Sequence, residues 1–323
     1  MTLILIFDAV NNGQINMNDL VTTSEYAKSM GGSQVFLETG ETQSVETLIK
    51  CIVVASGNDA SVAMAAHLCG SEAEFVKKIN ERASGLGMEN THFEDCCGLT
   101  DSDGHYTSAK DVALMSRELI TKYPEITQYS AIWMENITHV TDKGHKEFGL
   151  DNTNKLLKQY EYTTGLKTGS TSKAKYCVSA TAIKADVELI AVIMAAPDYK
   201  IRFSEAKTLL EYGFNCCHMY RDLNVDIVKS VKVKGGTKYE ISALYDKEFS
   251  YICKNNETPE SVEKKIILPD EISAPVNKHD VIGKAEYYIG GKLIGTVNIK
   301  AGEEIKKADY IYNLLKVLKN GLL

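Results

Sequence analysis

The stretch GLKTGSTSKAKYCVSATAIKADVELIAVIMA, residues 165–195, decides the fold, because the sequence pattern changes there from helices to strands. Extended segments are expected at Leu166–Ser170, Tyr176–Ile183 and Glu188–Ala195, and short polar turns join them. A helix that includes Phe214 follows the last of these segments. Strands that follow a helical region and precede another helix indicate an α+β domain.

The helical region upstream contains a polar interruption. Ser44 is expected to cap a helix that runs toward Ala55. Ser56-Gly57-Asn58 interrupts this helix, and the small residues of Asp59–Cys69 resume it. The Ser-x-Asn motif is therefore predicted at a junction between two helices.

Downstream of Met219 the pattern becomes all β. Its clearest element is the hairpin Ala285–Ile299, which turns at Gly290-Gly291. We therefore expect a larger first domain, a small β-rich domain and a tail helix. Their predicted extents are residues 1–218, 219–305 and 306–323.

The tail helix is predicted to be amphipathic. Its apolar residues share one face, with Lys316 and Lys319 beside it; they are Ile311, Leu314, Leu315, Leu318 and Leu322. This face could lie in a membrane surface or dock on its own domain.

Composition excludes several classes of partner. The net charge is −7 and the basic residues are scattered, so no basic stripe suited to nucleic acid is present. The eight cysteines include no Cys-x-x-Cys, and no histidine pair stands at ligand spacing. We expect buried free thiols, and neither a metal site nor a disulfide framework is predicted.

The first ten residues, MTLILIFDAV, have no basic region before the apolar run and no small-residue cleavage site after it. No signal peptide is therefore predicted, which taken literally indicates a cytoplasmic chain. Spanning a bilayer requires about 20 apolar residues, so we expect a buried helix here.

Short blocks spread over the first domain carry a family resemblance. They are Gly32–Leu37, Ala55–Ala60, Leu86–Met88, Thr91, Phe93, Gly98-Leu99, Tyr106–Ala109, Asp111, Asn152–Asn154 and Gly165–Gly169. In this order and spacing they resemble the low-molecular-weight penicillin-binding proteins of the D-alanyl-D-alanine carboxypeptidase family, peptidase family S11. The resemblance implies an antiparallel sheet between helical clusters, as in β-lactamases and DD-peptidases, followed by a small all-β domain. It also implies a serine-type enzyme that removes the terminal D-alanine from peptidoglycan stem peptides through an acyl-enzyme.

The resemblance implies catalytic roles for three residues. Ser56 would relay a proton, and Asn58 would hydrogen-bond the family's catalytic lysine and the substrate amide. Lys167, on an edge strand, would lower the pKa of that lysine and attract the substrate carboxylate.

Four further residues are implied in substrate binding. Thr168 would hydrogen-bond the substrate carboxylate, and Gly169 belongs to the same Lys-Thr-Gly motif. The backbone N–H of Ser170 would form part of the oxyanion hole. Arg202 stands where the family has an arginine that supports carboxylate recognition; an ordinary surface ion pair is the alternative.

The chain departs from the family pattern at its start. In the family, Ser-x-x-Lys opens the first long helix and is followed at once by an apolar stretch resembling residues 1–10. We therefore expect the nucleophilic serine, its base lysine and the first sheet strands to be absent from residues 1–323, and this chain alone to be inactive. Other Ser-x-x-Lys strings, expected to be chance matches, lie at 170–173, 204–207 and 261–264.

Two other functions remain open. One is a β-lactamase, although Gly57 between Ser56 and Asn58 and the appended β domain favour the peptidase. The other is a nucleophile-free muropeptide-binding or scaffolding protein. The peptidase would act outside the cytoplasmic membrane in its complete form, associated with that membrane. It would be inhibited by β-lactam antibiotics and would need no cofactor, since serine acyl transfer requires only positioned donors and a base.

Overall fold

The computed structural model describes residues 1–141 and 144–321. The chain divides into two compact units, Met1–Phe214 and Asn215–Leu323, which are described separately. We call them unit 1 and unit 2.

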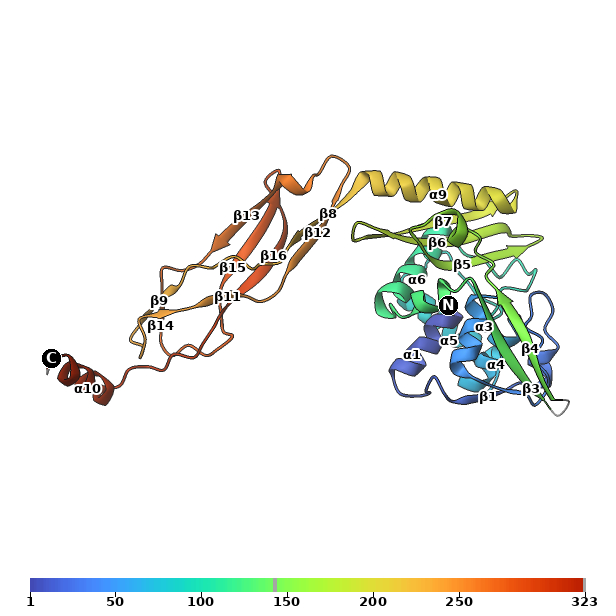
Figure 1. Ribbon diagram of the computed structural model, residues 1–323, viewed down its shortest axis with the longest axis horizontal. Helices are drawn as coiled ribbons and strands as arrows, with labels where there is room; N and C mark the ends of the chain where they lie inside the picture. Colours follow the sequence, from blue (N-terminus) through green and yellow to red (C-terminus); the bar gives the residue numbers. More distant parts are fainter. Residues whose placement is uncertain (142–143, 322–323) are drawn as a thin grey trace. The chain divides into compact units, whose positions relative to one another are not determined.

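Unit 1 begins with a group of helices around one buried helix, α4 (Figure 1). Nine of the twelve residues of α4 are buried, and many are alanine or serine, so neighbouring helices can approach closely. Serine side chains cap α3, α5 and α6 by accepting a hydrogen bond from a backbone N–H three residues on. The bounds are α1 Thr2–Asn11, α3 Val45–Val53, α4 Asn58–Cys69, α5 Glu72–Gly85 and α6 Ala109–Lys122.

The stretch that decides the fold forms an antiparallel sheet in the order β5-β6-β7. Its strands are β5 Thr163–Thr171, β6 Lys175–Lys184 and β7 Val187–Ala196. Helix α9, Tyr199–Cys216, covers one face, and α6 packs on the other (Figure 1). The predicted α+β class is therefore confirmed, and within the described residues β5 and β7 are the two edges of this sheet.

Short elements complete unit 1. Two small antiparallel pairs, β1-β2 and β3-β4, flank the helices. The bounds are β1 Leu20–Thr22, α2 Glu25–Lys28, β2 Thr42–Ser44, α7 Ile126–Ser130, β3 Met134–Thr141, β4 Gly144–Asp151 and α8 Leu156–Gln159.

Unit 2 is rich in β structure, with its own core around the fully buried Tyr287. The four-stranded sheet has the order β11-β16-β15-β13, the three-stranded sheet β10-β9-β14, and β8 pairs with β12. The bounds are β8 Cys217–Asp222, β9 Val231–Lys234, β10 Glu240–Ile241, β11 Ala243–Tyr245, β12 Phe249–Lys254, η1 Pro259–Ser261, β13 Val262–Ile267, β14 Glu271–Ser273, β15 Val281–Ile289 and β16 Lys292–Ala301. The β-rich second domain predicted from the sequence is confirmed.

The tail helix, α10, spans Tyr310–Gly321 and so begins four residues later than predicted. Its apolar residues Ile311, Leu314, Leu315 and Leu318 are exposed, whereas the expected contribution of Leu322 lies outside the described residues. No helix in the described ranges has the length and apolar character needed to cross a membrane.

The Asp59 carboxylate joins the start of α4 to the segment before α3. Asp59 is 1% exposed, and its oxygens accept hydrogen bonds from the backbone N–H groups of Val35 at 3.2 Å, Leu37 at 3.1 Å and Ala60 at 2.9 Å. Bonds of this kind to a charged acceptor are individually stronger than neutral ones. Asp59 therefore fixes the segment that leads into the site described below.

We expect Asp59→Ala to lower the free energy of unfolding of unit 1 by on the order of 3 kcal/mol, because buried backbone donors lose a charged acceptor. Chemical denaturation followed by a probe in unit 1 measures this. The exposed Asp101→Ala is the matched control, with an expected change within about 0.5 kcal/mol. Equal effects of the two substitutions would contradict the role given to Asp59.

Candidate active site

The segment between α3 and α4 brings Ser56 to strand β5. Ser56 has a φ of 61°, in the left-handed region that residues other than glycine seldom adopt. Its hydroxyl accepts a hydrogen bond from Lys167 Nζ at 2.8 Å. The two motifs predicted to act together, one from the helical layer and one from the sheet, are therefore in direct contact.

Lys167 is a cation held in a poorly solvated position. Its Nζ also donates to the carbonyl oxygen of Thr168 at 2.9 Å, and among the described residues it forms no salt bridge. Burial lowers the pKa of Lys167 to about 8, and the nearby charge of Arg202 contributes in the same direction. A cation of this kind is suited to binding an anionic group such as a carboxylate.

Asn58 holds the loop that faces the motif. Its Nδ2 donates to the carbonyl oxygen of Gly31 at 2.9 Å, and its backbone N–H donates to that of Ser33 at 2.8 Å. Gly32 between them has a φ of +74°, and a Cβ there would lie 2.8 Å from Asn58 Nδ2. Only glycine can therefore occupy position 32 without displacing Asn58.

Two pockets of about 210 Å³ meet at Lys167. The first has a mixed polar lining that includes Ser56, Asn58 and Lys167, together with Thr2, Leu3, Asp95, Cys96, Cys97 and His105. The second is mostly apolar and lies between Lys167-Thr168-Gly169 and side chains of α1, α6 and β7. A ligand held by the Lys167 ammonium would thus have a polar and an apolar surface beside it.

The other predicted binding residues lie along β5 and α9. Thr168 is buried, and its hydroxyl donates to Thr153 Oγ1 at 2.7 Å, whereas Ser170 is exposed near the end of the strand. Arg202 is 8% exposed and donates to the carbonyl oxygens of Gly169 at 3.1 Å and Cys177 at 3.2 Å. No salt bridge of Arg202 occurs in the described ranges, so the contacts differ from those of an ordinary surface ion pair.

The Ser-x-x-Lys strings at 170–173, 204–207 and 261–264 make hydrogen bonds with groups other than Ser56. Lys173 bonds to the Asp101 carbonyl oxygen and pairs with Asp103. The Ser204 hydroxyl donates to the carbonyl oxygen of Ile201, one turn away in α9, and Lys264 donates to Asn224 and Asp226. In the part of the chain that the structure describes, none of these strings has a serine hydrogen-bonded to its own lysine.

Sequence reasoning assigned no role to two residues that shape this site. Thr153, the partner of Thr168, lies in the Asn152–Asn154 block, and Gly32 lies in the Gly32–Leu37 block. Both blocks were recognised as family signals. Only the three-dimensional arrangement identifies which side chain each block faces.

Comparison with known proteins gives two family matches. The family described as "D-alanyl-D-alanine carboxypeptidase" matches residues 1–198, and "Penicillin-binding protein 5, C-terminal domain" matches residues 225–307. D-alanyl-D-alanine carboxypeptidase DacF of Bacillus subtilis is 41% identical over 320 residues, covering 98% of this chain and 81% of that protein. DacA of Escherichia coli K12 is 32% identical over 327 residues, covering 99% and 79%.

Solved structures agree with these matches. Penicillin-binding protein 5 from Haemophilus influenzae has a TM-score of 0.70 and 29% identity, covering 95% of this chain and 88% of its own. Penicillin-binding protein 6B from Escherichia coli has a TM-score of 0.68 and 28% identity, covering 92% and 84%. The likeness therefore extends over both units.

We expect Lys167 to titrate near pH 8 in the folded protein, more than two units below an exposed lysine, because burial disfavours its charged form. NMR titration of the Lys167 side chain, assigned with Lys167→Arg, measures the midpoint. Arg202→Gln should raise it, since a neighbouring positive charge is removed. A midpoint near the ordinary value of about 10.4 would contradict the electrostatics described here.

Proposed function

The chain belongs to the D-alanyl-D-alanine carboxypeptidase family, and from this premise we propose that it forms most of a serine-type enzyme that removes the terminal D-alanine from peptidoglycan stem peptides through an acyl-enzyme. The observation that supports this most directly is the 2.8 Å hydrogen bond between Lys167 Nζ and Ser56 Oγ, in a pocket that Asn58 also lines. The arrangement provides a proton-relay hydroxyl, a cation and an amide side by side.

The proposed roles follow from these contacts. The Lys167 ammonium would attract the carboxylate of the terminal D-alanine, and the Thr168 hydroxyl beside it would bind that carboxylate. Ser56, already in contact with Lys167, would pass a proton between the catalytic lysine and the leaving amine. The Asn58 amide would hydrogen-bond that lysine and the substrate amide, and the Ser170 backbone N–H would donate to the oxyanion.

Arg202 is proposed as a supporting residue for carboxylate recognition. Its two hydrogen bonds go to the carbonyl oxygens of Gly169 and Cys177, so it would act by fixing the end of β5 next to the Lys-Thr-Gly motif. Its charge also helps to keep the pKa of Lys167 low.

We propose that the nucleophilic serine and its base lysine come from a Ser-x-x-Lys segment that leads into α1. Two observations support this origin. Met1 and Leu3, at the first turn of α1, line the same pocket as Ser56 and Lys167. Among the described residues, the Ser-x-x-Lys strings considered above make their hydrogen bonds elsewhere. On this proposal residues 1–323 do not form an acyl-enzyme by themselves.

The proposed setting is outside the cytoplasmic membrane, in association with it, with stem peptides as substrates and β-lactams as inhibitors. The exposed apolar side chains of α10 suit contact with a membrane surface more than docking on unit 2. The family matches to both units favour a peptidase over a β-lactamase.

A second candidate, a muropeptide-binding protein without a nucleophile, is favoured by one observation. Described residues of this chain already line a polar pocket that contains the Lys167 cation, a feature that binding alone would use. The coding sequence immediately upstream of the Met1 codon distinguishes the two candidates. An in-frame Ser-x-x-Lys supports the enzyme, whereas a stop codon there supports the binding protein.

We expect the polypeptide 1–323 not to be labelled covalently by a fluorescent penicillin, because no Ser-x-x-Lys pair is among the described residues that line the pocket. The same chain extended by an upstream Ser-x-x-Lys segment should be labelled with one penicillin per chain. The label is read by gel fluorescence and intact mass. Stoichiometric labelling of the shorter polypeptide, or none of the extended one, would contradict the proposed acyl-enzyme.

In the extended protein, Lys167→Ala should lower kcat/KM for a D-Ala-D-Ala peptide by on the order of 10²–10³-fold, because a preorganised cation is removed from the site. The exposed Lys175→Ala, in the adjacent strand, is the matched control and should leave kcat/KM unchanged. The rate of D-alanine release measures both. Similar losses in the two variants would refute the role of Lys167.

A further inference from the structure

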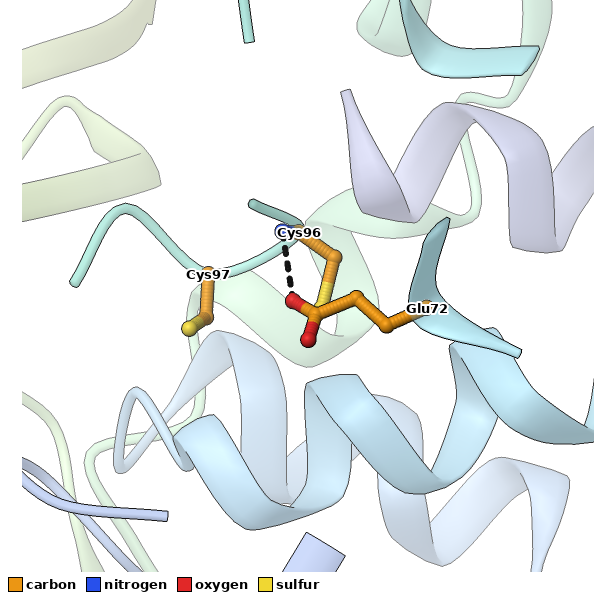
Figure 2. Close-up of side chains that lie close together, drawn as sticks. All are labelled: Glu72, Cys96 and Cys97. Atoms are coloured by element: carbon orange, nitrogen blue, oxygen red, sulfur yellow. Dashed lines mark hydrogen bonds between the residues drawn. The ribbon is translucent and has the colours of Figure 1, made fainter. Parts of the chain in front are cut away.

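One side-chain cluster beside the polar pocket has no part in the proposed reaction. Glu72, the first residue of α5, lies against Cys96 and Cys97 in a loop distant in sequence (Figure 2). A carboxylate oxygen and the two Sγ atoms all lie within 4.8 Å of one another. We propose that Glu72, Cys96 and Cys97 form a binding site for a zinc ion.

The carboxylate is held in place by two hydrogen bonds. Glu72 Oε1 accepts from the backbone N–H of Cys96 at 3.0 Å, drawn as a dashed line in Figure 2, and Oε2 accepts from the Tyr26 hydroxyl at 2.8 Å. Metal-binding carboxylates are commonly oriented by such outer hydrogen bonds. These two hydrogen bonds stabilise the local fold. They also hold a carboxylate oxygen of Glu72 next to the two thiols.

The loop that carries the thiols is fixed from its other side. The Asp95 carboxylate accepts hydrogen bonds from the backbone N–H groups of Cys97 at 3.0 Å, Leu99 at 2.9 Å and Thr100 at 2.7 Å. The Cys96 carbonyl oxygen accepts from the Thr2 hydroxyl at 2.5 Å. The backbone of the two cysteines is therefore preorganised, and only side-chain torsions remain to be set on binding.

The ligand set matches zinc chemistry. Zinc binds thiolate at about 2.3 Å and carboxylate oxygen at about 2.0–2.2 Å in a tetrahedron, so its ligand atoms stand about 3.6–3.8 Å apart. The ligand atoms here lie within 4.8 Å of one another, so their separations must contract by at most about 1 Å. Figure 2 shows the Cys97 sulfur directed away from the other two groups, and rotation about its Cα–Cβ bond supplies this movement.

The electrostatics of the cluster also favour a cation. Two thiolates beside a carboxylate would repel one another, and a divalent cation with soft-ligand affinity removes that repulsion. Cys96 and Cys97 also line the polar pocket, so a fourth coordination position has access to water.

Sequence spacing gave no sign of this site, since Glu72 and Cys96 are 24 residues apart and no Cys-x-x-Cys is present. Another adjacent pair, Cys216–Cys217, serves as an internal comparison. It lies at the end of α9 and the start of β8, outside the described metal-ligand clusters. The two pairs therefore differ in the presence of a carboxylate partner.

Zinc titration of the full chain under reducing conditions, in competition with a chromophoric chelator, tests the proposal. We expect one tight site per chain, and Co²⁺ in its place should give thiolate-to-cobalt charge-transfer absorption. Cys96→Ser with Cys97→Ser should abolish both signals. Glu72→Gln keeps an oxygen that can accept the Cys96 N–H, yet should weaken zinc binding on the order of tenfold or more.

The matched control is Cys216→Ser with Cys217→Ser, which should bind zinc as the parent chain does. Cys97→Ser alone changes a partly exposed position, so it is less able to disturb folding than the double substitution. It should also lose the charge-transfer band. Thermal unfolding without metal verifies that each variant is folded. Undiminished binding in the Cys96/Cys97 variant, or equal loss in the control, would overturn the site. These readouts require no peptidase activity, so they stand apart from the proposed function.

Discussion

A poorly solvated cation with no carboxylate partner among the described residues is the constraint on which the candidate active site depends. Lys167 is held by a serine hydroxyl and a carbonyl oxygen, both neutral, so its charge is solvated by the protein without being neutralised. Such a position costs free energy that a salt bridge would offset. In the proposed function, an incoming anion supplies the missing partner of Lys167 at the moment of binding.

The surrounding fold maintains this arrangement by fixing both sides of the cleft. On one side, buried α4 is anchored through Asn58 and Asp59 to the segment that runs from Gly31 to Leu37. On the other, Arg202 holds β5 to the adjoining strand through carbonyl oxygens of both. The Ser56–Lys167 contact connects these two rigid parts, so neither needs a flexible loop to bring its side chain into reach.

Much of this could be predicted from the sequence because the relevant signals are local. The spacing of apolar residues and the turn residues between the segments predict β5, β6 and β7. Serine caps mark where α3, α5 and α6 begin. The pairing of Ser56 with Lys167 was predictable only through the family's motif order. What escaped prediction involves close approaches between distant segments: Gly32 against Asn58, Thr153 against Thr168, and Arg202 against two carbonyl oxygens. Glu72 with Cys96 belongs to the same group, since no residue pattern encodes that proximity.

The loop that contains Asp95, Cys96 and Cys97 contributes to both sites that this structure suggests. Asp95 fixes the backbone that carries Cys97, while the same loop lines the polar pocket with Ser56 and Lys167. A metal ion that draws the Cys97 sulfur inward would change the wall of that pocket without moving Ser56 or Lys167. Binding at two sites that share a wall is reciprocal, so any factor by which zinc alters ligand affinity is also the factor by which the ligand alters zinc affinity. Backbone N–H groups of this loop are already hydrogen-bonded to Asp95, so its backbone is held in place. Any coupling between the two sites would therefore act through the positions of side chains.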